Sequence, residues 1–114
     1  MRVSVVVCEH SMERYDDFRE AVESVRSQTH DDVELVLVSD GNETVCQRFR
    51  DDYGDVDNVV VECLSDNLGL LAARNEGARV ASGDVVAFMD DDAVADEDWI
   101  AELVQIYEER DVPA

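Results

Sequence analysis

The stretch Gly83-Asp-Val-Val-Ala-Phe-Met-Asp-Asp-Asp92 joins a short apolar run to three consecutive carboxylates, and it is the most informative segment of the chain. An apolar, partly β-branched run of this length is typical of a buried strand. Carboxylates as close as Asp90, Asp91 and Asp92 repel one another unless a positive charge lies among them. Mg²⁺ and Mn²⁺ prefer such oxygen ligands and often share them with substrate phosphates. The pattern therefore predicts a strand that ends in a divalent-cation site, and a solvated acidic turn is the alternative.

The rest of the chain alternates apolar, strand-like runs with amphipathic segments. Runs rich in Val and Leu predict buried strands at residues 3–8, 33–39, 58–63 and 85–89. Apolar spacings of three or four predict helices at residues 14–28 and 69–81, a short helix capped by Asn42, and a last helix that Asp96 opens and Pro113 follows. This alternation predicts an α/β, Rossmann-like fold with a mostly parallel sheet.

Polar residues gather where the predicted strands end. Glu9 to Ser11 follow the first strand, Asp40 follows the second, and Asp90 to Asp92 follow the fourth. Asn67 and Arg74 lie around the start of the third helix. Ligands of parallel sheets bind beyond the carboxyl ends of the strands, so these residues are expected to form one site. A turn-shaping role for Asp40 and a structural ion pair for Arg74 are the alternatives.

Length and charge restrict the possible functions. The chain has 114 residues, enough for one domain, and a formal net charge of −20 from 29 acidic and 9 basic residues. Such a surface repels nucleic acid and anionic membranes. All basic residues are Arg, and we expect a cytosol rich in salt to screen the carboxylates. The sequence shows neither a signal peptide nor an apolar stretch near the ~18 residues of a membrane span.

The cysteine pattern predicts reduced thiols. Cys8, Cys46 and Cys63 are an odd number, are widely separated and include no C-x-x-C pair. Such a set is typical of buried thiols in a cytosolic protein, and not of a disulfide or zinc framework.

Four motifs follow one another along the chain. They are the Val-Ser-Val-Val-Val run at residues 3–7, Val36-Leu-Val-Ser-Asp40-Gly, Asn67-Leu-Gly-Leu-Leu-Ala-Ala-Arg-Asn-Glu-Gly77, and Asp90-Asp-Asp92. In order and spacing they resemble the N-terminal, nucleotide-binding half of an inverting GT-A glycosyltransferase of family two. The resemblance extends over essentially all of residues 1–114.

The resemblance implies a set of roles. Asp92 and Asp90 would hold Mg²⁺ or Mn²⁺ against the donor diphosphate, and Asp40 and Arg74 would contact the nucleotide base. In the family the acceptor-binding region and the catalytic base lie beyond the D-x-D motif, so no residue of this chain is assigned as the base. The chain is expected to be a fragment of the enzyme or a truncated descendant. The residues implied to bind the nucleotide sugar are Val7, Cys8, Glu9, Asp40, Asn67, Gly69, Arg74, Asp90 and Asp91.

A closer likeness concerns the segments around the first and fourth strands. Cys8, the run Ser11-Met-Glu-Arg-Tyr15 and residues 83–96 are similar to AglG-type enzymes of haloarchaeal S-layer protein N-glycosylation. These enzymes add a hexuronic acid to a dolichol phosphate-linked glycan at the cytoplasmic face of the membrane. The likeness implies a UDP-sugar donor, with UDP-glucuronate as one candidate, and a lipid-linked acceptor. Glu9 and His10 replace the Thr-Tyr or similar pair that the family usually has, so their roles stay open.

Three other functions were considered for this chain. A non-catalytic nucleotide-sugar-binding protein on the same fold is the main alternative. A receiver domain of signalling needs a lysine, and this chain has none. A calcium-binding module would use Asp90, Asp92 and Asp96, but Val94 and Ala95 stand where an EF-hand has an oxygen ligand and a glycine.

Overall fold

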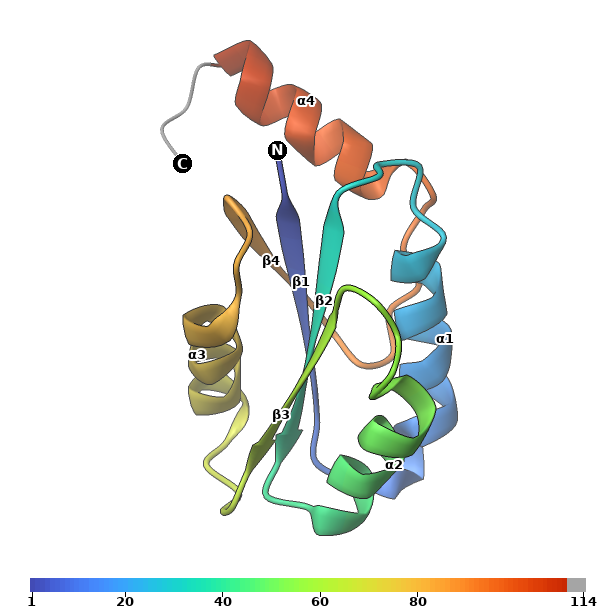
Figure 1. Ribbon diagram of the computed structural model, residues 1–114, viewed down its shortest axis with the longest axis vertical. Coiled ribbons are helices and arrows are strands. Elements are labelled where there is room, and N and C mark those ends of the chain that lie inside the picture. The colour runs from blue at the N-terminus through green and yellow to red at the C-terminus, as the bar shows by residue number, and fades with distance from the viewer. Residues whose placement is uncertain (111–114) are drawn as a thin grey trace.

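The computed structural model describes residues 1–110, which form an α/β fold around a four-stranded parallel sheet (Figure 1). The strand order is β3-β2-β1-β4. The strands are β1 (Val3–Glu9), β2 (Val33–Asp40), β3 (Val59–Leu64) and β4 (Val85–Met89). The helices are η1 (Met12–Arg14), α1 (Tyr15–Arg26), α2 (Glu43–Tyr53), α3 (Leu70–Val80) and α4 (Trp99–Arg110). The predicted fold class is confirmed, and the four strands lie within one residue of their expected bounds.

Alternate residues of the strands point into two apolar layers, as the two-residue period of a strand requires. Val5 and Leu37 face a large core that α1 and α2 cover, and Ile100 of α4 joins the same core. Val6 and Val38 face the opposite side of the sheet and pack with Ala73 of α3. Figure 1 shows α3 on one side of the sheet and α1 with α2 on the other. The sheet is therefore the middle layer of a three-layer fold.

Helix boundaries follow from local capping. The Asn42 side chain accepts a hydrogen bond from Val45 N, so the predicted cap of α2 is confirmed. Helix α4 begins at Trp99 and not at Asp96, because Asp96 forms a turn in which its carboxylate accepts from Asp98 N and its carbonyl from Trp99 N. The predicted place of Pro113 lies outside the described residues.

The expectation that all cysteines are reduced is wrong. Cys46 of α2 and Cys63 of β3 form a disulfide, and Cys8 is the free cysteine. Helix α2 follows β2 and packs beside β3, which brings the two Cα atoms to 5.8 Å. The pairing depends on tertiary packing across 17 residues, so cysteine count and spacing did not reveal it.

The strand order reverses beside β1, which is where open α/β sheets bind ligands. The chain passes from β1 outward to β2 and β3, and then crosses back to place β4 on the other side of β1. The carboxyl ends of β1 and β4 therefore lie side by side. No helix among residues 1–110 is both long enough and apolar enough to span a bilayer.

Candidate donor-binding site

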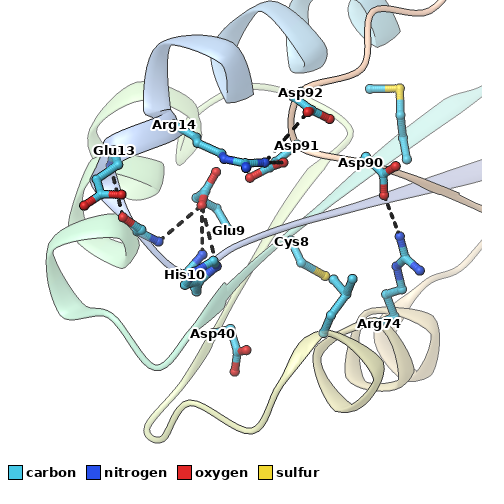
Figure 2. Close-up of a pocket in the computed structure, with 13 residues that line it drawn as sticks. Cys8, Glu9, His10, Glu13, Arg14, Asp40, Arg74, Asp90, Asp91 and Asp92 are labelled. Carbon is cyan, nitrogen blue, oxygen red and sulfur yellow. Dashed lines mark hydrogen bonds and ion pairs between the residues drawn. The ribbon is translucent and has the colours of Figure 1, made fainter.

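A cavity of about 500 Å³ lies at the carboxyl ends of β1, β2 and β4, where the sequence predicts the site (Figure 2). Its walls come from the β1–α1 connection, the end of β2, the first turns of α3 and the turn after β4. Four separate segments thus converge on one hollow. The lining residues are Cys8, Glu9, His10, Ser11, Glu13, Arg14, Asp40, Leu70, Arg74, Met89, Asp90, Asp91 and Asp92.

Glu9, the last residue of β1, is a buried carboxyl on the cavity wall. Its Oε1 accepts hydrogen bonds from His10 N at 3.0 Å and Ser11 N at 3.2 Å. Its Oε2 is buried and has no hydrogen-bond partner among the described residues. Burial, together with the facing Asp91 carboxylate, raises the pKa of Glu9 to about 7. The Glu9 carboxyl is therefore still partly protonated near neutral pH.

We expect Glu9→Gln to make the protein more stable than the wild type at pH 8 and to remove part of its pH dependence. The folded-state pKa of about 7 lies above the ordinary value of 4.5, so the folded state holds a proton that the unfolded state has released. This contribution is complete below pH 4.5 and is lost as the pH rises through 7. Glutamine can accept the same two N–H bonds and donate to Asp91 without a proton from solvent.

Urea unfolding at pH 5, 6, 7 and 8 in molar KCl measures this difference. The free energy of unfolding of the wild type relative to Glu9→Gln is expected to fall by roughly 1–3 kcal/mol across the series. Glu13→Gln, which removes an exposed carboxylate from the same cavity, serves as the control and is expected to give a flat difference. A flat difference for Glu9→Gln as well would contradict the raised pKa of Glu9.

The acidic turn formed by Asp90, Asp91 and Asp92 is held from two sides by arginines. Arg74 Nη2 lies 2.8 Å from Asp90 Oδ1. Arg14 Nη1 lies 3.4 Å from Asp91 Oδ1 and 3.7 Å from Asp92 Oδ2. Figure 2 shows the two arginines approaching the acidic turn from opposite sides. These pairs relieve the repulsion among the three carboxylates, and Arg74 forms an ion pair in the structure.

Asp40 links the end of β2 to the segment before α3. Its Oδ1 accepts from Leu68 N at 2.8 Å and its Oδ2 from Gly69 N at 3.1 Å. The side chain is buried, and both of its oxygens accept a hydrogen bond. A carboxylate has about four acceptor positions, so two remain for a ligand. These two bonds hold the segment before α3 and not the turn that follows β2, and Asp40 also lines the cavity.

Most of the sequence-predicted residues meet at the cavity, and three do not line it. Cys8, Glu9, Asp40, Arg74 and the acidic turn line the cavity. The Val7 side chain is buried in the core shared with α1, so it is turned away from the cavity. Asn67 and Gly69 lie in the segment before α3 and are exposed. Burial raises the pKa of the Cys8 thiol to about 11, so it remains protonated and is a poor nucleophile.

Arg14 is the functional candidate that sequence reasoning missed. It is the last residue of η1, and the position of that 3-10 turn above the acidic turn is a tertiary feature. The available signal was a basic residue just beyond the first strand, in a chain where basic residues are few.

The donor set fits a divalent cation that a substrate helps to hold. Among residues 1–110 no three His, Cys, Asp or Glu side chains form a preformed metal cage. Mg²⁺ commonly binds through one or two carboxylates plus substrate phosphates, and it has no need of such a cage. The Asp90 and Asp92 side chains are 67% and 58% exposed at the cavity, so both are accessible to a cation carried by a diphosphate.

Comparison with known families identifies the fold and its family. The family model described as Glycosyl transferase family 2 matches residues 4–112. The chain belongs to glycosyltransferase family 2. A solved structure of S. aureus TarS 1-349 in complex with UDP-GlcNAc superposes with a TM-score of 0.80 at 24% identity, covering 96% of this chain and 32% of that chain. The superposition shows that this chain has the same fold as the matching part of TarS.

Two curated relatives in family 2 are similar over most of the chain. The glucosyl-dolichyl phosphate glucuronosyltransferase of Haloferax volcanii is 55% identical over 108 residues, which are 95% of this chain and 34% of the relative. The putative glycosyltransferase EpsH of Bacillus subtilis is 36% identical over 98 residues, which are 86% of this chain and 26% of the relative. The chain thus spans about a third or less of the length of these relatives.

Proposed function

We propose that the protein binds a UDP-linked sugar in the cavity at the carboxyl ends of β1 and β4, as the donor-binding part of an inverting glycosyltransferase. The observation that carries the proposal is the convergence of Asp40, Arg74 and the acidic turn on one cavity of a family 2 fold. The similarity to a glucosyl-dolichyl phosphate glucuronosyltransferase supports a hexuronic acid donor and a dolichol phosphate-linked acceptor. We extend the proposal to protein N-glycosylation at the cytoplasmic face of the membrane, on the resemblance of residues 83–96 to AglG-type enzymes.

In this proposal Asp90 and Asp92 hold Mg²⁺ or Mn²⁺. The cation supplies charge neutralisation for the departing nucleoside diphosphate. Arg74 is bonded to Asp90 in the structure, so a cation at Asp90 competes with that ion pair. Arg74 and Asp40 both line the cavity, and the free donors of Arg74 and the free acceptor positions of Asp40 would contact the nucleotide base. Glu9 faces Asp91 beside the proposed cation ligands and helps to position that side chain.

Donor binding is expected to require the cation. Titration calorimetry of UDP-glucose or UDP-glucuronate in Mn²⁺ is expected to give an affinity at least about tenfold higher than in chelator, since metal neutralisation of a diphosphate is worth several kcal/mol. Asp92→Ala is expected to remove the dependence on metal. Asp91→Ala is the comparison variant and is expected to have a smaller effect, because that side chain is 16% exposed and faces Glu9. Equal affinity with and without chelator would refute the metal role.

A further inference from the structure

We propose that Arg14 binds the carboxylate of an anionic donor sugar, and that it selects a nucleotide-linked hexuronic acid over a neutral hexose. The inference rests on the proposed function and adds to it the residue that determines sugar specificity. It starts from the position of a positively charged side chain. Arg14 lies on the wall of a cavity that is otherwise lined largely by acids.

The guanidinium of Arg14 is held beside the acidic turn, and most of its N–H donors are free within the described residues. Its side chain is 59% exposed, and within the described residues it donates one hydrogen bond, to Asp91 Oδ1 at 3.4 Å. The Asp92 carboxylate lies slightly farther away, at 3.7 Å. A guanidinium has five N–H donors, and two parallel ones suffice for bidentate binding of a carboxylate. Arg14 thus has the free donors that such a ligand needs.

Charge in the cavity makes such a partner necessary for an anionic sugar. Six of the lining side chains are carboxylic acids, namely Glu9, Glu13, Asp40, Asp90, Asp91 and Asp92. A further carboxylate at about 4 Å from an ionised one would be repelled, and more strongly the lower the local dielectric constant. The proposed divalent cation would neutralise the diphosphate. The carboxylate of a uronate therefore needs a separate positively charged group.

The order of the groups around the cavity assigns that role to Arg14. The described lining has two arginines, Arg14 and Arg74. Arg74 contacts Asp90 and shares its side of the cavity with Asp40, the proposed base contact. Arg14 contacts the other end of the acidic turn, and Figure 2 shows it on the side away from Arg74 and Asp40. With the base at one end and the diphosphate at the acidic turn, the sugar lies toward Arg14.

Calorimetric titration with UDP-glucuronate, UDP-glucose and UDP, each in Mn²⁺, tests the inference. Arg14→Gln is expected to lower the affinity for UDP-glucuronate about tenfold or more, as loss of a charge-assisted pair does. The affinities for UDP-glucose and UDP are expected to change less than about twofold. Arg14→Lys is expected to fall between, because a lysine keeps the charge without the bidentate fork. Arg48→Gln is the matched control, since Arg48 stacks on Tyr15 outside the cavity.

The possible outcomes separate this inference from the proposed function. Equal losses for all three ligands would mean that Arg14 holds the diphosphate or the acidic turn, and would overturn the inference alone. Unchanged binding of UDP-glucuronate to Arg14→Gln would overturn it as well. A wild-type protein that binds none of the three ligands would refute the proposed function itself and the inference with it. Thermal melting of each variant confirms that folding is intact, as expected for an exposed side chain.

Discussion

Gly41→Ala is expected to lower the free energy of unfolding by roughly 3–5 kcal/mol and to weaken UDP binding about tenfold. Gly41 has a φ of +75°, a conformation that strains any residue with a Cβ. An added Cβ would also overlap backbone atoms of Asp66 and Asn67. The segment before α3 would have to move, and the bonds from Leu68 N and Gly69 N to the neighbouring Asp40 would be lost with it.

Gly69→Ala provides the matched control for this experiment. Gly69 also has a positive φ, of +94°, but a Cβ added there would meet no atom within 4 Å. Gly69→Ala is expected to lower the free energy of unfolding by the backbone strain alone, roughly 1–3 kcal/mol. Chemical denaturation of the two variants, followed by UDP titration, separates strain from collision. Equal destabilisation by both substitutions would show that the packing of residues 66–67 on Gly41 contributes nothing.

Much of the fold could be predicted because the elements are locally specified. The β-branched runs of β1 and β2 identify buried strands, and Asn42 marks the start of α2. The sequence does not distinguish the two glycines of the Asn67–Gly77 motif, Gly69 and Gly77. The structure separates them, since Gly77 packs against Val6 and Val38 of the sheet, whereas Gly69 has open space and a positive φ.

The site could be predicted only at the level of segments. Residues that follow strand ends, such as Asp40 and the acidic turn, were located correctly because a parallel sheet brings its carboxyl ends together. The contacts between these segments could not be predicted, because they depend on where side chains meet in space. The facing carboxyls of Glu9 and Asp91, the ion pairs of Arg14 and the Cys46–Cys63 disulfide each join residues far apart in sequence.

The protein is expected to be much more stable in 2 M KCl than in dilute buffer, with a melting temperature higher by about 10 °C or more. The chain has 29 acidic residues against 9 basic ones, so most carboxylates can have no basic partner. Two like charges 10 Å apart in water repel by about 0.4 kcal/mol, and the Debye length shrinks from about 30 Å at 0.01 M to about 3 Å at 1 M. Screening of many such pairs adds up to several kcal/mol, and each 1 kcal/mol shifts the melting temperature by about 4–8 °C. The arginines that form ion pairs in the described structure are Arg2, Arg14, Arg26, Arg48, Arg74 and Arg79.

Substitutions that remove negative charges separate the screening of carboxylate repulsion from a general effect of concentrated salt. Asp55 and Asp57 lie in the exposed connection between α2 and β3 and form no ion pair in the described structure. The double variant Asp55→Asn with Asp57→Asn is expected to melt above the wild type in dilute buffer, because two repelling charges are gone. In 2 M KCl the two proteins are expected to melt together, since screening has already removed the repulsion there. A melting temperature of the wild type that is flat or falling with KCl would mean that carboxylate repulsion does not limit its stability. It would leave the donor-binding proposal unchanged, because that proposal rests on the cavity at the carboxyl ends of β1 and β4 and not on the net charge.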